Sequence, residues 1–226
     1  MRALSFVFRA SGAPALFLGL FPLATAGEPE PAAEWLPPFR VIELARVEQY
    51  DALPQDIARY RLKRRVFATE PGRVVYEDCE RRLGSKKPET CTLVFVGAGG
   101  YGNVASMLKG AWDWWSPPQI LLPPNPRVGA RWSAIHQKRG GVSERTCEVL
   151  ADESVCADGL EVRCHTAFPT ASVVIGTHYC RGRGWVGEDV LSSYPDGHRF
   201  SSSSFALTID GQPAPEPKGG NWNPME

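Results

Sequence analysis

The chain has 226 residues, with 25 basic and 25 acidic side chains and no net charge at pH 7. A balanced charge provides no electrostatic attraction to nucleic acid, so a charge-driven nucleic-acid partner is excluded. The length suits one domain with a substantial apolar core, and we expect a single domain.

The first 26 residues are typical of a secretory signal peptide. Arg2 and Arg9 precede an apolar run, and Ala24-Thr25-Ala26 supplies a small-x-small cleavage site. The apolar run has about half of the roughly twenty residues that span a bilayer, which argues against a transmembrane anchor. No cysteine follows the run to accept a lipid. We therefore predict an exported protein, periplasmic or secreted, without stable membrane insertion.

The ends of the mature chain differ in composition from its middle. Residues 27–38 are rich in Pro, Ala and Glu, and residues 211–226 are rich in Gly and Pro, as in flexible solvated arms. Residues 39–210 carry short β-branched apolar runs that alternate with turn residues. This pattern predicts a single all-β domain, an antiparallel meander that forms a curved sheet or half-barrel stapled by disulfides.

The first clear hairpin joins residues 74–80 to residues 90–96 through a turn centred on Ser85. Cys79 and Cys91 lie symmetrically about that centre. If the chain folds there, their Cβ atoms come within disulfide distance, whereas a slip by one residue would turn one of them to the opposite face. We predict the disulfide Cys79–Cys91, worth about 3 kcal/mol in the chain-entropy model.

The glycine-rich stretch 97–102 matches the dinucleotide-binding pattern G-x-G-x-x-G and follows an apolar strand. That pattern requires a strand that leads into a helix of a parallel βαβ unit, whereas residues 103–110 are short and run into Trp-rich and Pro-rich chain. A loop that turns with positive φ is the better interpretation. We predict no nucleotide and no other cofactor.

Three tryptophans, Trp112, Trp114 and Trp115, begin a proline-rich extended segment. We expect this segment to cross the sheet as a connector, because Ile120, Leu121 and Leu122 need a core, although a domain boundary is the alternative. Such indoles more often cover a core, but they are also candidates for ligand contact. In an extended segment, Trp112 and Trp114 share one face and Trp115 has the other.

The second half of the chain continues the meander. We predict strands near residues 131–137, 143–155, 160–168, 172–180, 184–191 and 199–209. A turn at Pro169 puts Cys180 next to Cys156, and Cys147 then pairs with Cys164 by exclusion. Four cysteines allow three connectivities, however, and the sequence does not decide among them.

All six cysteines follow the predicted cleavage site, and an even count in an exported chain is typical of a disulfide framework. Zinc is the alternative. No C-x-x-C occurs, and His136, His165, His178 and His198 are not spaced as in common zinc modules. We predict no metal.

No catalytic constellation is evident. The run Ser201–Ser204 lacks a G-x-S-x-G elbow, and no H-E-x-x-H occurs. Four acidic residues cluster around the predicted turn at residues 157–159, which is typical of a solvated face. They are Asp152, Glu153, Asp158 and Glu161. We predict that the protein is not an enzyme. The alternative is a secreted hydrolase, which would need a histidine and a carboxylate to converge on a serine or a metal.

Residues 177–189 combine a cysteine, three glycines and two aromatics, and we expect the glycines to serve a tight reversal of the chain. Tyr179, Gly182, Gly184 and Val186 form a Tyr-x-x-Gly-x-Gly-x-Val element. This element resembles one in uncharacterised exported bacterial β-domain proteins and lipoproteins.

The resemblance extends over about residues 123–191, with a Pro-rich lead into Val128-Gly129-x-x-Trp132 and a hairpin turn like Cys156–Gly159. This chain departs from the family pattern by carrying cysteines within the matched segment. It implies a half-barrel similar to periplasmic lipoprotein carriers, whose curved sheet holds an acyl chain, and it implies no activity. We therefore expect a noncatalytic role in binding an apolar small molecule or an envelope protein.

Overall fold

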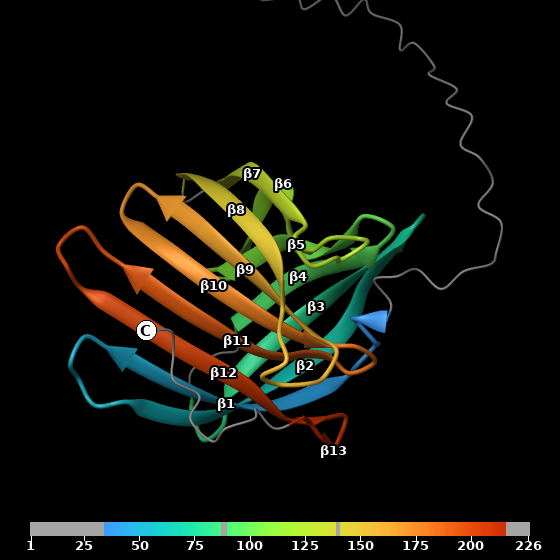
Figure 1. The fold of residues 1–226 in the computed structure, drawn as a ribbon, viewed down its shortest axis with the longest axis horizontal. Coiled ribbons are helices and arrows are strands. Elements are labelled where there is room, and N and C mark those ends of the chain that lie inside the picture. Colours follow the sequence, from blue (N-terminus) through green and yellow to red (C-terminus); the bar gives the residue numbers. More distant parts are fainter. Residues whose placement is uncertain (1–33, 87–89, 139–140, 216–226) are drawn as a thin grey trace, which may run out of the picture.

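The computed structural model describes residues 34–86, 90–138 and 141–215. The predicted signal peptide and the first part of the expected N-terminal arm lie outside these ranges. The strands follow one another in chain order around a barrel (Figure 1). They are β1 (Val41–Tyr50), β2 (Asp56–Glu70), β3 (Arg73–Arg82), β4 (Thr90–Gly97), β5 (Gly100–Leu108), β6 (Ala111–Leu122), β7 (Arg131–Lys138), β8 (Gly141–Ala151), β9 (Gly159–Phe168), β10 (Ala171–Cys180), β11 (Gly184–Ser193), β12 (Arg199–Ile209) and β13 (Gln212–Pro213).

Each strand alternates between an inner and an outer face, which is why the apolar rhythm has a period of two. In β8, Ser143, Arg145, Cys147 and Val149 are buried, and the residues between them are more exposed. Every neighbouring pair is antiparallel, so the predicted all-β meander is confirmed. The strand predicted over 143–155 is shorter, because the chain leaves the sheet after Ala151.

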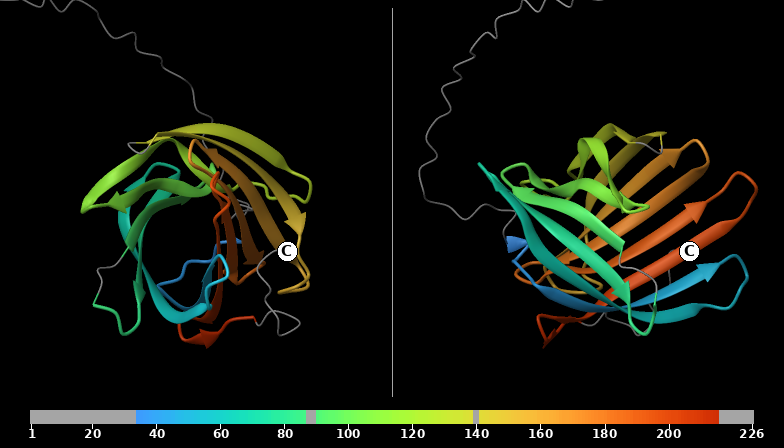
Figure 2. Two further views of the ribbon diagram at one scale, coloured as in Figure 1. Left: turned by 90° about the vertical axis from the view of Figure 1, so that its left-hand side faces the viewer. Right: turned by 180° about the vertical axis from the view of Figure 1, so that it is seen from behind.

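The predicted half-barrel is wrong, because the sheet closes on itself. β1 forms a ladder with β12 that runs from Ile42 opposite Ile209 to Tyr50 opposite Phe200. This pairing satisfies backbone groups that an open sheet would leave bare at its two edges. Figure 2 shows the resulting barrel from its side and from behind.

The join between β6 and β7 is the weakest part of the described barrel. It has one paired position, Ser116 opposite Gln137, supported by a contact of 3.0 Å between His136 Nδ1 and the carbonyl of Pro117. Residues 115–118 of β6 bulge opposite Val104 of β5, because proline has no N–H to donate to a ladder. The expected proline-rich connector is thus a bulged strand.

The glycine-rich stretch is the tight turn from β4 to β5, as expected. Gly100 has φ of 95°, and a Cβ there would lie 2.3 Å from the carbonyl oxygen of Leu122. Glycine is therefore required both by the backbone conformation and by the close approach of β6. Since β5 returns antiparallel to β4, the stretch does not form a dinucleotide-binding unit.

All three predicted disulfides are present: Cys79–Cys91, Cys147–Cys164 and Cys156–Cys180. The first two link residues directly opposite each other on neighbouring strands. The third ties the loop after β8 to the end of β10. Disulfides of this kind are typical of proteins from oxidising compartments.

The described part of the expected N-terminal arm over residues 27–38 is packed rather than solvated, which corrects the expectation for residues 34–38. Trp35 and Leu36 are buried against Leu122, Val162 and Tyr179 inside one end of the barrel. We call residues 34–39 the plug segment. In the expected C-terminal arm, residues 211–226, β13 pairs with β12, and residues 216–226 lie outside the described ranges.

The Tyr-x-x-Gly-x-Gly-x-Val element holds the plug segment as well as turning the chain. Gly182 and Gly184 have φ of 72° and 85°, as the predicted reversal requires. The N–H of Gly182 donates to the carbonyl of Glu34 at 2.6 Å, and a Cβ on Gly184 would lie 3.1 Å from the ring of Pro37. A side chain at Gly184 would crowd the plug.

Candidate binding site in the barrel interior

The barrel interior contains charged side chains from strands far apart in the sequence. Arg46 of β1 donates to Glu80 of β3 at 2.7 Å and to Ser204 of β12 at 2.8 Å. Burial opposes the charge of Arg46, but Glu80 outweighs it and the pKa of Arg46 is raised. The contact with Ser204 crosses the β1–β12 closure, so the barrel must be closed for it to form.

A second ion pair lies beneath the plug segment. Arg64 of β2 donates to both carboxylate oxygens of Asp78 at 2.7 Å and 2.6 Å, and its guanidinium lies 3.9 Å from the ring centroid of Phe39. Burial raises the pKa of the neighbouring Tyr101 to about 12. This bidentate pair is almost fully removed from solvent, so each partner depends on the other for its charge balance.

Arg145 of β8 differs from these two arginines. Its side chain is buried, with 5% exposure of the residue, and its Nε donates only a weak contact of 3.3 Å to Cys147 Sγ. Within the described ranges no carboxylate lies at ion-pairing distance from it, and burial lowers its pKa. Burial likewise raises the pKa of Glu188. This residue attracts Arg145 electrostatically but forms no ion pair with it. The interior therefore holds a guanidinium that forms no ion pair with an acid of the described chain.

Three buried hydroxyls on the inner wall lack a hydrogen-bond partner among the described residues, and they belong to Ser143, Thr166 and Tyr179. Thr166 lies directly opposite Arg145 in the β8–β9 ladder, and Ser143 is the next inward residue of β8. A buried polar group without a partner costs about 1–3 kcal/mol. A cation together with several such hydroxyls is the arrangement expected around an anionic or polar ligand.

Apolar side chains line the inner wall next to Arg145 and these hydroxyls. Strand alternation places Val173 and Ile175 of β10 on the same face as Tyr179, and Val190 of β11 on the same face as Glu188. These residues are only half-buried although they point inward, so solvent reaches the interior at their level. The inner wall thus offers an apolar surface next to a buried cation.

A separate buried cluster lies on the outer face of β10 and β11. His178 Nδ1 is 2.7 Å from Asp152 and its Nε2 is 3.2 Å from Asp189, while Ser203 Oγ donates to the other oxygen of Asp189 at 2.5 Å. The expected solvated face is therefore partly wrong: Asp152 and Glu161 are buried, because the loop after β8 folds over the sheet.

This cluster bears on the hydrolase alternative. A nucleophilic serine needs a basic nitrogen of histidine at its hydroxyl. Here Asp189 stands between Ser203 and His178, and both ring nitrogens already contact carboxylates. The required residue types converge, but in this order the histidine holds two acids together, and the serine hydroxyl donates to one of those acids.

The electrostatics agree with a structural role. Burial alone would lower the pKa of His178, but the hydrogen bonds to Asp152 and Asp189 outweigh it and raise the pKa to about 9. Burial alone would raise the pKa of Asp152, but hydrogen bonds from His178 and Ser154 outweigh it and lower the pKa to about 2. The imidazolium is therefore the stable form between two carboxylates.

We expect this cluster to make stability fall at alkaline pH. The pKa of His178 is raised on folding, so its contribution is complete below its ordinary value of 6.5 and is lost as the pH rises through about 9. The full contribution is about 3 kcal/mol. Urea unfolding at a series of pH values should show that the free energy of unfolding declines between those limits. His178→Gln should flatten the decline, and His165→Gln, at an exposed site, should leave it in place. An unchanged pH profile in His178→Gln would contradict the assignment.

The other histidines and the candidate tryptophans do not join this cluster. Trp112 contacts Phe67 edge to face on the outer side of the barrel, whereas Trp115 contacts His136, with ring centroids 6.0 Å apart. His165 contacts Ser172, and His198 contacts Asp51, both at exposed positions. The three tryptophans thus divide between different surroundings.

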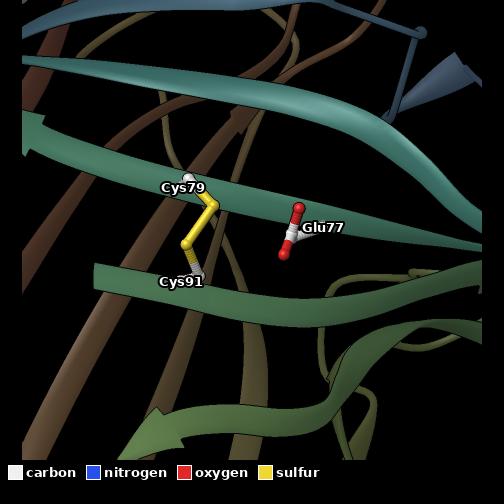
Figure 3. Close-up of side chains that lie close together, drawn as sticks. All are labelled: Glu77, Cys79 and Cys91. Atoms are coloured by element: carbon white, nitrogen blue, oxygen red, sulfur yellow. A yellow bond between two sulfur atoms is a disulfide. The ribbon is translucent and has the colours of Figure 1, made fainter. Parts of the chain in front are cut away.

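Glu77, Cys79 and Cys91 come close enough together to suggest a metal site (Figure 3). The two sulfur atoms are bonded to each other, so neither is a thiolate ligand, and Glu77 pairs with Arg65. The group as folded is a disulfide beside an ion pair.

Sequence reasoning missed Arg145 and the His178 cluster. One signal for Arg145 was available: it occupies the inward register of Ser143, Cys147 and Val149, where an arginine is out of place. No comparable signal exists for the cluster, since Asp152, His178 and Asp189 meet only through the fold.

Among the described residues, no helix has the length and hydropathy needed to cross a bilayer. No family model and no curated protein matches the chain. A solved structure from Bacteroides fragilis NCTC 9343, described as a presumed exported protein with a YmcC-like fold, is similar over 77% of this chain and 98% of its own, with 11% identity and a TM-score of 0.39. At that TM-score the likeness carries no argument about the architecture or the role of this chain.

Proposed function

We propose that the protein is an exported, noncatalytic binding barrel whose interior takes a small amphipathic anion. The observation that carries the proposal is Arg145, a buried guanidinium without a neutralising carboxylate among the described residues. The unpartnered hydroxyls of Ser143 and Thr166 beside it would hydrogen-bond the anionic group. The half-buried inner side chains of β10 and β11 would contact an apolar body.

Export is supported by the predicted signal peptide and by three disulfides, which persist in oxidising compartments. A noncatalytic role is supported by the His178 cluster, in which both ring nitrogens contact carboxylates and the Ser203 hydroxyl donates to Asp189. The sequence-based expectation of a purely apolar ligand is modified by the charge of the inner wall.

The test compares dodecanoate with dodecanol, which share a chain but differ in charge. We expect dodecanoate to bind the intact protein more tightly than dodecanol, and we expect Arg145→Met to lose about tenfold or more in dodecanoate affinity, because a charge-assisted hydrogen bond contributes about 1.5–3 kcal/mol. Arg183→Met, on an exposed turn, is the matched control. Isothermal titration calorimetry measures both affinities.

The same variant distinguishes a binding arginine from a structural one. Since Arg145 is buried and forms no ion pair, replacing it with methionine should leave the free energy of unfolding unchanged or raise it, by up to about 2 kcal/mol. Loss of affinity without loss of stability supports the binding site. Absence of dodecanoate binding in the intact protein, or equal affinity in Arg145→Met, would reject it.

A further inference from the structure

The outer face of β2 carries cations at every second position, and they are Arg59, Arg61, Lys63 and Arg65. On the next strand Arg81 lies directly opposite Arg61. Like charges opposite each other on one face of a sheet are destabilising. We call these five residues and Arg40, which precedes β1, the basic face.

Part of the basic face is neutralised within the protein. Arg61 pairs with Glu43 at 2.7 Å, and Arg65 pairs with Glu77. The side chains of Arg40, Arg59 and Lys63 have no carboxylate at ion-pairing distance among the described residues, and neither does Arg81, which donates weakly to the Ser85 carbonyl at 3.4 Å. Four exposed cations therefore remain available to an external anion.

Three shallow hollows meet on the basic face, with volumes of about 380, 840 and 430 Å³. Lys63 lines all three, Arg61 lines two of them, and Arg40 lines two. The surface around Lys63 is thus indented as well as positively charged, and it has room for anionic groups between the side chains.

Exposed aromatic residues continue this surface beyond Arg65. Phe67 is 49% exposed on the β2–β3 hairpin, which projects from the rim of the barrel (Figure 2). Phe67 contacts Trp112 edge to face, with ring centroids 6.3 Å apart, and Trp114 of the same strand is 55% exposed. Cations next to exposed indoles match the headgroup level of a bilayer, where tryptophan is enriched.

We propose that the basic face, with Phe67, Trp112 and Trp114, docks the folded barrel on an anionic lipid surface. The cations contact phosphate-bearing headgroups, and the rings enter the interfacial layer without crossing it. The charge complementarity of Lys63 and its neighbours favours a lipid surface over an apolar partner, and the exposed rings favour it over a dissolved anion.

The experiment measures co-sedimentation of the mature protein with vesicles of phosphatidylcholine alone and of phosphatidylcholine with phosphatidylglycerol. We expect binding only to the anionic vesicles, and a loss of roughly thirtyfold or more in the double variant Lys63→Glu/Arg81→Glu. Raising the salt concentration should weaken binding in the same direction. Arg127→Glu/Arg183→Glu, on other exposed positions, is the matched control and should bind like the unmodified protein.

A second readout concerns the rings. Trp114→Ser should weaken vesicle binding, and the indole emission should shift to shorter wavelength on binding in the unmodified protein. Equal binding to neutral vesicles, no effect of the charge reversal, or binding to soluble polyglutamate in place of vesicles would each overturn the proposal. Dodecanoate affinity should be unchanged in Lys63→Glu/Arg81→Glu, which keeps this test separate from that of the interior site.

Discussion

Replacing Asp78 with alanine should lower the free energy of unfolding by about 3–5 kcal/mol. Asp78 and Arg64 have side-chain exposures of 9% and 4%, and they form two hydrogen bonds shorter than 2.8 Å. Without Asp78 the guanidinium stays buried beneath the plug segment with no acid to balance it. The cost arises from that uncompensated charge, since an intact buried pair contributes little net stability by itself.

Urea unfolding followed by circular dichroism measures the effect of Asp78→Ala. The matched control is Asp56→Ala, which breaks the pair with Arg82 at 2.8 Å on an exposed surface and should cost little stability, because solvent screens the pair. The double variant Arg64→Met/Asp78→Leu should recover most of the lost stability, because it removes both charges. Equal losses in Asp78→Ala and Asp56→Ala would show that the pair is not isolated from solvent.

Replacing Trp35 with alanine should also cost about 3–5 kcal/mol, the range for a large aromatic residue in a core. Trp35 is 5% exposed and packs against Leu122, Val162 and Tyr179. The guanidinium carbon of Arg181 also lies over the indole, 5.2 Å from the ring centroid of Trp35. Its removal would leave a cavity at one end of the barrel and weaken the anchoring of the plug segment.

Thermal unfolding of Trp35→Ala tests whether residues 34–39 belong to the folded domain. Leu53→Ala, at a loop position with 60% exposure, is the control and should change stability by less than about 0.5 kcal/mol. If Trp35→Ala unfolded at the same temperature as the control, the segment would be the solvated arm that its composition suggests.

The losses of stability expected for Asp78→Ala and Trp35→Ala both concern the end of the barrel that the plug segment covers. The plug segment covers Arg64 and Asp78 at one end of the barrel, and the inner residues of β10 and β11 stay accessible elsewhere on the wall. The hollow beneath the plug measures about 90 Å³, which is too small for a chain-like molecule. A ligand in the interior would therefore approach Arg145 by the side that the plug leaves uncovered.

The hairpin of β3 and β4 was accessible to sequence reasoning because its information is local. Cys79 and Cys91 are 12 positions apart and symmetrical about the turn, so turn chemistry and side-chain alternation together define their register. The turn at Pro169 likewise suggested Cys156–Cys180, and Cys147–Cys164 followed by exclusion, although the sequence left two other connectivities open. The role of Gly182 and Gly184 in a tight reversal could also be predicted, since such a turn needs positive φ.

Closure of the barrel could not be predicted from such local patterns. The contact between Arg46 and Ser204 joins residues 158 positions apart, and neither strand carries a local mark of its partner. Whether a curved sheet stays open or closes depends on the accumulated twist of all its strands. Trp35 was missed for a related reason: a segment rich in proline and alanine looks solvated until a surface exists for it to pack against.

By itself the sequence determined the all-β class, the antiparallel order of the strands and the disulfide hairpin, because alternation, turn residues and short cysteine spacings act between near neighbours. Only the tertiary structure decided that the sheet closes, that Trp35 enters it, that Arg145 is buried without an acid, and that His178 lies between Asp152 and Asp189. Those outcomes depend on contacts between distant strands, and a pattern with a period of two says which face a side chain takes but not what it meets there.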